Sequence, residues 1–296
     1  MAYNSGHQAK ASDHNNALVY HPDPLSIKTG SEARLQYRHG KVAPFTQTTG
    51  VATGYMQGSP VIIPAALALD FLTMCQRNPK ACPVIAIAAT GDPSLPTLGA
   101  DIDVRTDIGG YRIWRDGELC DEVTDVRHLW RGDFVTFVIG CSYSFEDALL
   151  REGLKLRHHE QNVCVPMYRT KIPLISAGPF SGEVCVSMRP FRASDAIRAI
   201  EITSRFPLTH GSPLHIGDPR EIGIEDLSKP LVGDPVDIRP GELPVFWGCG
   251  ITPQYSLLSA KPEIAITHKP GCLLVSDVMS ASDALSMPRP AHMNLP

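Results

Sequence analysis

Two segments of the chain share one pattern, in which an apolar, β-rich run ends at a Gly-Cys pair and is followed by signals for a helix start. The segments are FVTFVIGCSYSFEDALL, which begins at Phe134, and LPVFWGCGITPQYSLL, which begins at Leu243. The change of pattern predicts a strand that passes directly into a helix, with Cys141 and Cys249 at the two junctions. Both thiols are then expected near the positive end of a helix dipole, where α/β enzymes place reactive groups.

The residues after each cysteine predict how the two helices begin. Ser144 and Asp147 have the spacing of a capping box, and Gly153 is expected to end the first helix. Thr252 before Pro253 predicts an N-cap with proline at the first helical position, where the missing N–H costs nothing.

Each predicted helix leads toward histidine, at His158 and His159 in the first unit and at His268 in the second. Each unit therefore has the pattern of a strand-helix-strand crossover, which brings the carboxyl ends of parallel strands to one sheet edge. This pattern favours an α/β fold with a mixed, partly parallel sheet flanked by helices, and the hypothesis of an internal repeat. On this hypothesis Cys141 faces His158 or His159, and Cys249 faces His268. The alternative is that the cysteines are small buried hydrophobes.

The middle of the chain predicts a smaller domain. Residues 161–235 contain the strand-like GEVCVSMRP and PLHIGDP and the helix-like SDAIRAIEITSRF, for which Ser194 is the expected cap. They favour a two-layer α+β domain inserted into a main α/β domain of residues 25–160 and 236–280. Residues 1–24 and 281–296 are expected to be mobile tails.

Composition excludes several functional classes. The 296 residues carry a formal net charge of only -4 without a block of Lys or Arg, which argues against binding to nucleic acid. No apolar run approaches the ~20 residues that span a bilayer, and the N-terminus lacks the apolar core of a secretory signal, so we expect a cytosolic protein. The eight cysteines form no CxxC pair and are expected to be free thiols rather than disulfides or metal ligands. No cofactor is implied, and self-association into a homo-oligomer is left open.

Polar residues beside glycines and prolines supply further candidates for a site. Arginine suits bidentate capture of carboxylates, and histidine can act as a general acid or base near neutral pH. This chemistry suits a small substrate that carries a carboxylate. The alternative is that the arginines are solvated and the histidines cap local turns, and the histidine spacing matches no strong metal motif. The candidates are Tyr168, Arg169, Arg189, Arg205, His210, His215 and Asp218.

A family resemblance rests on many separate strings in one order. They are GYMQG, CQRNPKACP, IGCSYSFE, VPMYRT, SMRP, TSRFPLTHGSPLHIGDP, FWGCGITPQ and AITHKPG, within residues 31–277. Together they resemble the bacterial "putative hydro-lyase" family related to mitochondrial D-glutamate cyclase. Ser59, Cys164 and Cys272 depart from the family pattern, which has asparagine at the first two positions and a bulkier residue at the third. The resemblance implies reversible loss of water from D-glutamate to give 5-oxo-D-proline.

Two mechanisms fit these residues. In the first, one of the arginines binds a carboxylate, His210 or His215 takes the amine proton, and the N–H groups after Gly140 stabilise the oxyanion. In the second, Cys141 or Cys249 is a thiolate that forms a thioester with the γ-carboxyl group. Ring closure is intramolecular, so ATP is not required, and no P-loop is present. A dehydratase of another small hydroxy or amino acid and a non-catalytic protein that binds an amino acid or oxoproline are the alternatives.

Overall fold

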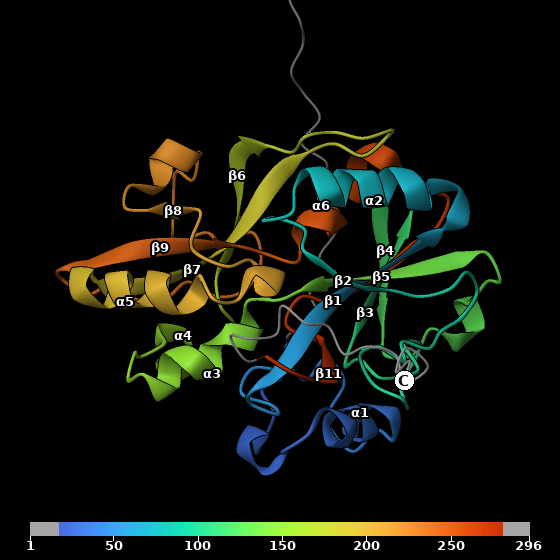
Figure 1. Cartoon of the computed structure of the whole chain (residues 1–296), viewed down its shortest axis with the longest axis horizontal. Coiled ribbons are helices and arrows are strands. Elements are labelled where there is room, and N and C mark those ends of the chain that lie inside the picture. The colour runs from blue at the N-terminus through green and yellow to red at the C-terminus, as the bar shows by residue number, and fades with distance from the viewer. Residues whose placement is uncertain (1–17, 281–296) are drawn as a thin grey trace, which may run out of the picture.

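The computed structural model describes residues 18–280, which form two β-sheets with helices on their outer faces (Figure 1). The tails predicted at 1–24 and 281–296 lie outside these residues except for 18–24. Within that short stretch Val19 forms a β-bridge with Thr46.

The first sheet has seven strands in the order β2-β5-β1-β10-β3-β4, and β11 also pairs with β1. Every pairing in it is antiparallel. The strands are β1 (Tyr55–Pro64), β2 (Val84–Ile87), β3 (Tyr111–Arg115), β4 (Glu118–Val123), β5 (Phe134–Gly140), β10 (Ala265–His268) and β11 (Leu274–Met279).

The second sheet has four strands in the order β6-β7-β9-β8, again antiparallel. The strands are β6 (Met167–Pro173), β7 (Glu183–Arg192), β8 (His215–Ile216) and β9 (Glu242–Gly248). Strand β9 comes from outside residues 161–235, the range in which the sequence placed the smaller domain.

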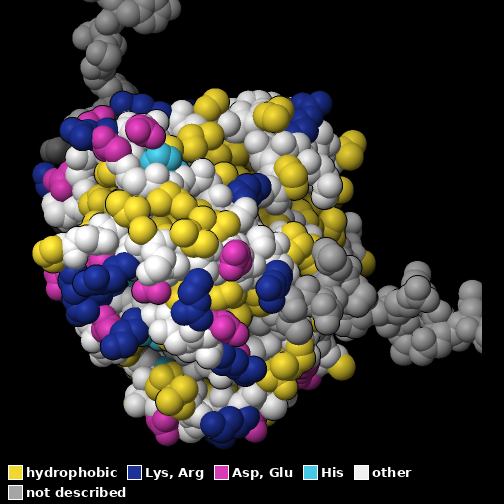
Figure 2. Space-filling model, turned by 60° about the vertical axis from the view of Figure 1, so that its left-hand side comes forward, with side chains coloured by type: hydrophobic (Ala, Val, Ile, Leu, Met, Phe, Trp, Pro, Cys, Tyr) yellow, Lys and Arg dark blue, Asp and Glu magenta, His cyan; other side chains and the backbone are white. Residues whose placement is uncertain are grey.

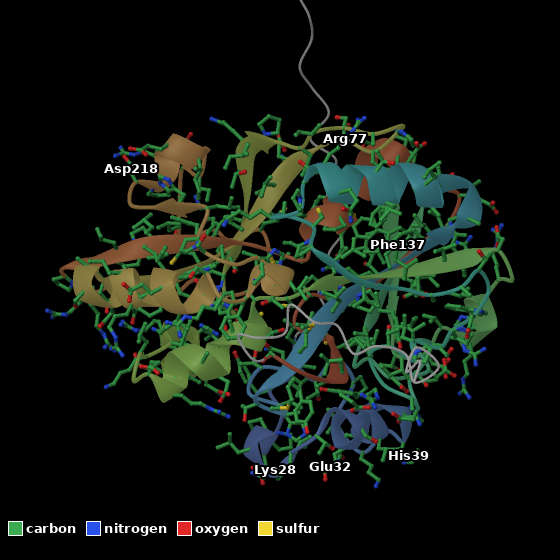
Figure 3. The ribbon with its side chains drawn as sticks, viewed as in Figure 1. Lys28, Glu32, His39, Arg77, Phe137 and Asp218 are labelled. Atoms are coloured by element: carbon green, nitrogen blue, oxygen red, sulfur yellow. The ribbon has the colours of Figure 1, made fainter. Side chains whose placement is uncertain are left out.

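Six α-helices and five short 3-10 turns among residues 18–280 connect the strands and pack against the two sheets. In Figure 1, α2 lies above the first sheet, α1 below it, and α3, α4 and α5 beside the second sheet. A capping box between Thr29 and Glu32 starts α1, and Figure 3 labels Glu32 near that start and His39 after the helix ends. The helices are α1 (Gly30–Arg38), α2 (Ala68–Arg77), α3 (Tyr143–Arg151), α4 (Arg157–Gln161), α5 (Ala193–Thr203) and α6 (Thr252–Ala260). Short 3-10 turns are η1 (Pro24–Ser26), η2 (Ala65–Leu67), η3 (Arg127–Leu129), η4 (Pro207–Thr209) and η5 (Pro219–Ile222).

Strand β5 lies at the centre of the core because both of its faces are covered. Phe137 points into the cluster shared by the two sheets and α2, where its ring centroid lies 4.8 Å from that of Phe71 (Figure 3). Val138, the next residue, points into a separate cluster on the other face of the first sheet. Successive strand residues face opposite sides, so an apolar run without alternation is what a doubly covered strand requires.

The expectation of a partly parallel sheet is wrong. A doubly buried apolar strand is typical of parallel sheets, but here α2 and the second sheet cover one face of β5 and a long loop covers the other, instead of two layers of crossover helices. The internal repeat is not supported either. After β5, α3 leads to α4 and then to the second sheet, whereas α6 connects β9 of the second sheet to β10 of the first.

Several predicted helix ends are also corrected. Helix α3 begins at Tyr143, and the hydroxyl of Ser144 bonds the backbone of Gln57 instead of capping the helix. Helix α6 begins at Thr252 itself, and α5 has no side-chain cap at Ser194 or elsewhere. In each case a tertiary partner or the preceding strand determines where the helix starts.

The surface of the described residues carries mixed charge. On the face shown in Figure 2, basic and acidic side chains are interspersed with apolar ones. Among residues 18–280, no helix combines the length and apolar character that crossing a bilayer requires.

Candidate functional site

A small, largely apolar cavity lies where the two sheets meet, at the β5–α3 and β9–α6 junctions. Cys141 comes from the first sheet and Cys249 from the second, and both line the cavity with His268 from the end of β10. Its volume of about 20 Å³ is enough for one water molecule. The structure therefore brings together three of the residues that the sequence singled out.

Two glycines allow the junctions to pack this closely. A Cβ at Gly140 would lie 1.8 Å from the carbonyl oxygen of Leu208, and one at Gly250 would lie 2.2 Å from the Oγ of Ser59. No larger residue fits either position without a shift of the backbone or of Ser59. The Ser59 hydroxyl also lines the cavity, is buried and has no hydrogen-bond partner among the described residues.

Both thiols are protonated in their buried environment, but they are not equivalent. Burial raises the pKa of Cys141 far above that of a free thiol. Burial also raises the pKa of Cys249, but only to about 11, because the N–H groups of Ile251 and Gly250 at the start of α6 favour the thiolate. Cys249 is therefore the more acidic of the two.

His268 forms a neutral wall of the cavity. Burial, together with the positive charge of Arg112, lowers the pKa of His268 to about 3. The side-chain amide of Gln254 lies 3.1 Å from Nδ1, and the carbonyl of Pro60 accepts a hydrogen bond from the ring. With both ring nitrogens engaged, His268 is not available as a base near neutral pH.

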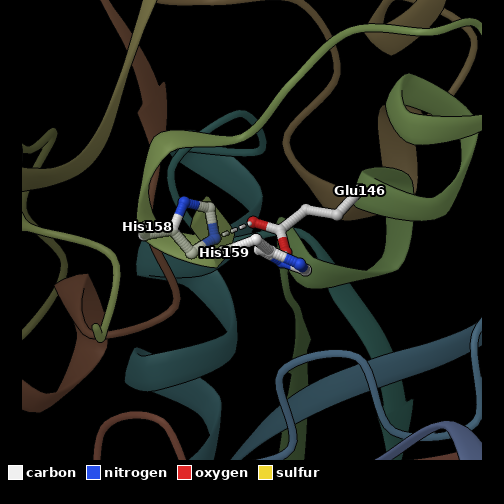
Figure 4. Close-up of side chains that lie close together, drawn as sticks. All are labelled: Glu146, His158 and His159. Atoms are coloured by element: carbon white, nitrogen blue, oxygen red, sulfur yellow. Dashed lines mark hydrogen bonds and ion pairs between the residues drawn. The ribbon is translucent and has the colours of Figure 1, made fainter. Parts of the chain in front are cut away.

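A buried ionic cluster lies behind the cavity lining, and Figure 4 shows three of its members, Glu146, His158 and His159. The Glu146 carboxylate accepts from Arg189 Nε at 3.0 Å and lies 3.0 Å from His158 Nε2 and 2.9 Å from His159 Nε2. Burial alone would raise the pKa of Glu146, but His158 and Arg189 hold it well below its usual value. Burial lowers the pKa of His158 to about 4, so its imidazole is neutral at pH 7.

This cluster positions the polar part of the cavity lining. Arg189 donates to the hydroxyls of Ser187 at 3.0 Å and Ser142 at 3.1 Å, and both serines line the cavity. Glu146, His158 and His159 are also the described residues grouped closely enough to hold a metal ion. However, the guanidinium of Arg189 already neutralises Glu146, and a cation there would have to compete with it. We assign the cluster a positioning role.

A larger hollow of about 350 Å³ lies beside the cavity and contains two cationic side chains. Arg112 Nε donates to Glu122 at 3.0 Å, and the Lys269 ammonium pairs with the other carboxylate oxygen of Glu122. Both cations are nearly inaccessible, at 9% and 2% exposure, whereas Asp234 lines the hollow as an exposed residue. Two buried cations thus share one buried carboxylate, which leaves one positive charge in excess among the buried groups, while the Asp234 carboxylate lies on the exposed side of the hollow.

The cavity and the hollow share one chain segment. His268 and Gly271 line the cavity, whereas Lys269 and Pro270 between them line the hollow. A ligand carboxylate at Arg112 and Lys269 would therefore lie close to His268, whose pKa the charge of Arg112 helps to lower.

The other predicted arginines and the tyrosine lie outside the cavity. Arg189 is buried behind it, Arg169 is exposed and pairs with Glu183, and Arg205 is exposed. Tyr168 is buried in the core, where its hydroxyl donates to the carbonyl of Leu227 at 2.7 Å.

The remaining predicted residues also lie away from the two thiols. His210 is buried with Nδ1 3.0 Å from the Lys80 carbonyl oxygen, and burial lowers its pKa to about 4. His215 Nε2 lies 2.8 Å from the backbone carbonyl of Asp218, and the Asp218 side chain caps η5 and pairs with Arg220. Neither histidine lines the cavity or the hollow.

Sequence reasoning missed four residues that the structure places at the site. Glu146 and Lys269 lie within the strings IGCSYSFE and AITHKPG, and Ser59 directly follows GYMQG. Their proximity to the predicted thiol and histidine was the available signal. No sequence signal pointed to Arg112, because an arginine in a strand next to a hairpin turn is usually solvated.

Comparisons with known proteins agree on one family. The D-glutamate cyclase family model matches residues 135–277, which include both thiols and Lys269. A protein named "Putative hydro-lyase" from Bordetella petrii is 56% identical over 257 residues, which cover 87% of this chain and 97% of that protein. Another of that name from Bradyrhizobium diazoefficiens is 54% identical over 264 residues, with 89% and 95% covered. A third from a Methylobacterium species is 54% identical over 260 residues, with 88% and 96% covered.

Proposed function

This chain belongs to the hydro-lyase family related to D-glutamate cyclase, and on that premise we propose that it interconverts D-glutamate with 5-oxo-D-proline and water, without a nucleotide. The observation that carries the proposal is the buried cation pair of Arg112 and Lys269 beside the two-thiol cavity. A dicarboxylic amino acid needs a site that holds one carboxylate firmly while the other end reacts.

The charges of the substrate fit this arrangement. The hollow of about 350 Å³ has room for the substrate: the α-carboxylate binds Arg112 and Lys269, and the γ-carboxyl group lies at the side of the hollow that adjoins the cavity. There the backbone N–H groups at the start of α3 and α6 can stabilise the oxyanion that forms when the amine attacks. The attack is intramolecular, and orientation alone can supply an effective molarity of ~10⁵ M or more.

Ring closure also requires proton transfer. The ammonium has three protons, of which one stays on the lactam nitrogen and two leave with a carboxyl oxygen as water. A thiol can relay a proton by donating it to the departing oxygen and accepting one from nitrogen. Cys249 suits this role better than Cys141, because burial raises its pKa less, to about 11. His210 and His215 are not needed as the base.

The activity is tested by incubating the protein with each enantiomer of glutamate and of 5-oxoproline without nucleotide, followed by chiral chromatography. Turnover confined to the D series is the expected result. No turnover in either direction would overturn the cyclase proposal.

A matched pair of variants tests the binding role of the cation pair. Arg112→Gln removes a charge-assisted contact of roughly 1.5–3 kcal/mol, which corresponds to a KM increase of roughly 10–100-fold. Arg115→Gln changes an exposed arginine on the same strand and should leave KM unchanged. Equal KM values for the two variants would exclude Arg112 from carboxylate binding.

A further inference from the structure

Two polar side chains in the wall of the hollow carry oxygens without a partner. Gln47 lines the hollow and is 1% exposed, and its side-chain oxygen Oε1 accepts no hydrogen bond from the residues that the structure describes. Tyr20 lines the same hollow, and its hydroxyl is likewise buried and without a partner within residues 18–280. Buried polar atoms are nearly always paired, so two unpaired oxygens in one wall indicate a ligand that completes them.

Gln47 belongs to a chain segment that runs beside the cation pair. The N–H of Thr48 donates to the carbonyl oxygen of Gly271 at 2.9 Å, and the Lys269 ammonium lies 4.9 Å from the centroid of the Phe45 ring. The two segments therefore lie side by side, with Gln47 and Lys269 in the wall of one hollow.

A short piece of parallel β-structure holds Tyr20 in this wall. The N–H of Val19 donates to the carbonyl of Phe45 at 3.0 Å, and the N–H of Gln47 donates to the carbonyl of Val19 at 2.8 Å. Successive residues of an extended segment face opposite sides, so Leu18 and Tyr20 line the hollow while Val19 between them is 37% exposed. The first described residues, which the sequence placed in a tail, thus form part of the site.

The electrostatics of this wall differ from those of the cation pair. Burial raises the pKa of Tyr20, and nearby negative charge, including that of Asp234, raises it further, so the phenol stays neutral. The Asp234 carboxylate is held in place because it accepts from the N–H of Cys164 at 2.9 Å. Two neutral oxygens with a carboxylate nearby suit an ammonium group or an amide N–H, whereas the cation pair suits a carboxylate.

We propose that Gln47 and Tyr20 form the subsite that binds the substrate nitrogen, so that the hollow selects an α-amino acid or its lactam over a simple dicarboxylate. The inference rests on the proposed function, which places the α-carboxylate at Arg112 and Lys269. The two oxygens accept hydrogen bonds from the ammonium of glutamate, and one of them accepts from the N–H of 5-oxoproline. Carboxylate, nitrogen and side chain are three different groups on Cα, and fixing each at its own part of the hollow distinguishes the enantiomers.

The test compares two ligands that differ by one amine. Isothermal titration calorimetry at pH 7 measures the affinities for D-glutamate and for glutarate, which has both carboxylates but no nitrogen. Gln47→Met keeps most of the side-chain volume and removes the amide. The ratio of the D-glutamate affinity to the glutarate affinity should fall roughly 10–100-fold in this variant, the contribution of a hydrogen bond to a charged group. Its affinity for glutarate itself should not fall.

Further variants separate nitrogen binding from folding. Tyr20→Phe removes only a hydroxyl, should lower the same ratio, and provides the test if Gln47→Met does not fold. Tyr37→Phe is the matched control and should leave the ratio unchanged. The Tyr37 hydroxyl is also buried without a partner among the described residues, but Tyr37 lines a separate hollow. The preference of the wild-type protein for D-glutamate over L-glutamate should shrink in Gln47→Met.

The outcomes distinguish this subsite from the cyclase activity. Turnover of D-glutamate with a ratio that neither Gln47→Met nor Tyr20→Phe lowers would overturn the nitrogen subsite and leave the cyclase. A lowered ratio in a protein that shows no turnover would support the subsite and overturn the cyclase. Equal loss of affinity for both ligands in Gln47→Met would overturn the assignment of Gln47 to nitrogen, because the substitution would then act on the carboxylate site or on the fold.

Discussion

Replacement of Arg189 by methionine provides a quantitative test of how the cavity is supported. The Arg189 side chain is fully buried and donates to Glu146, Ser187 and Ser142. Methionine retains much of the volume of the side chain, but it leaves the buried Glu146 charge without its cation. Breaking a buried ion pair by removing one partner costs about 3–5 kcal/mol, mostly through the uncompensated charge.

The size of the effect on melting follows from the length of the chain. With 296 residues and an unfolding entropy of about 2.1 cal/mol/K per residue, the entropy of unfolding is about 0.6 kcal/mol/K. A loss of about 4 kcal/mol should therefore lower Tm by roughly 6 °C. The double variant Glu146→Met, Arg189→Met removes both charges, and it should regain most of the lost stability.

Thermal and urea unfolding followed by circular dichroism, combined in a double-mutant cycle, measure the coupling. Arg198→Met is the control, because Arg198 pairs with Glu152 at the surface, where ion pairs contribute about 0–1 kcal/mol. The reasoning is refuted if Arg189→Met costs no more than this control, or if the effects of the two substitutions simply add.

Three further outcomes are expected. Gly140→Ala should destabilise the protein by roughly 3 kcal/mol or more in urea unfolding, because its Cβ would overlap the Leu208 carbonyl; a loss below about 1 kcal/mol would contradict the close approach. The free energy of unfolding should fall as the pH drops from 6.5 toward 4, by up to about 1.4 kcal/mol per pH unit for each imidazole. The reason is that three histidines take up protons in this range in the unfolded chain, whereas burial keeps them neutral in the folded chain. Urea midpoints measured between pH 7 and 4.5 check this slope, and a flat profile would argue against the neutral, buried state of His158, His210 and His268. A thiol reagent should modify one cysteine rapidly in the native protein and none in Cys120→Ala, since Cys120 is exposed and the other seven cysteines are buried.

The sequence predicted the location of the thiols because the signals there are local. An apolar run that ends at Gly-Cys before a helix start requires only neighbouring residues to be recognised. The structure has both junctions, with α3 beginning at Tyr143 and α6 at Thr252. The pairing of the strands could not be predicted in the same way, because burial of β5 on both faces depends on a second sheet formed by distant segments.

The cation pair of Arg112 and Lys269 could not be predicted from the sequence for a different reason. In the sequence, Arg112 belongs to a β-hairpin, and its cross-strand neighbour on β4 is Glu122. A pair of opposite charges at such positions is ordinary in an exposed sheet. In the structure both are buried, and Lys269, more than 140 residues later, pairs with the same carboxylate. No local pattern encodes a site that arises from three segments.

The antiparallel arrangement nevertheless brings the two cysteines together, which is what the predicted parallel sheet was meant to explain. A parallel sheet would place both cysteines at the carboxyl ends of strands in one sheet, on the same edge. Here each cysteine ends a strand of a different sheet, and the sheets meet at those ends, where Gly140 and Gly250 permit contact with Leu208 and Ser59. The corrected topology therefore brings both thiols to one cavity, from the ends of strands in two sheets instead of from one edge of a single sheet.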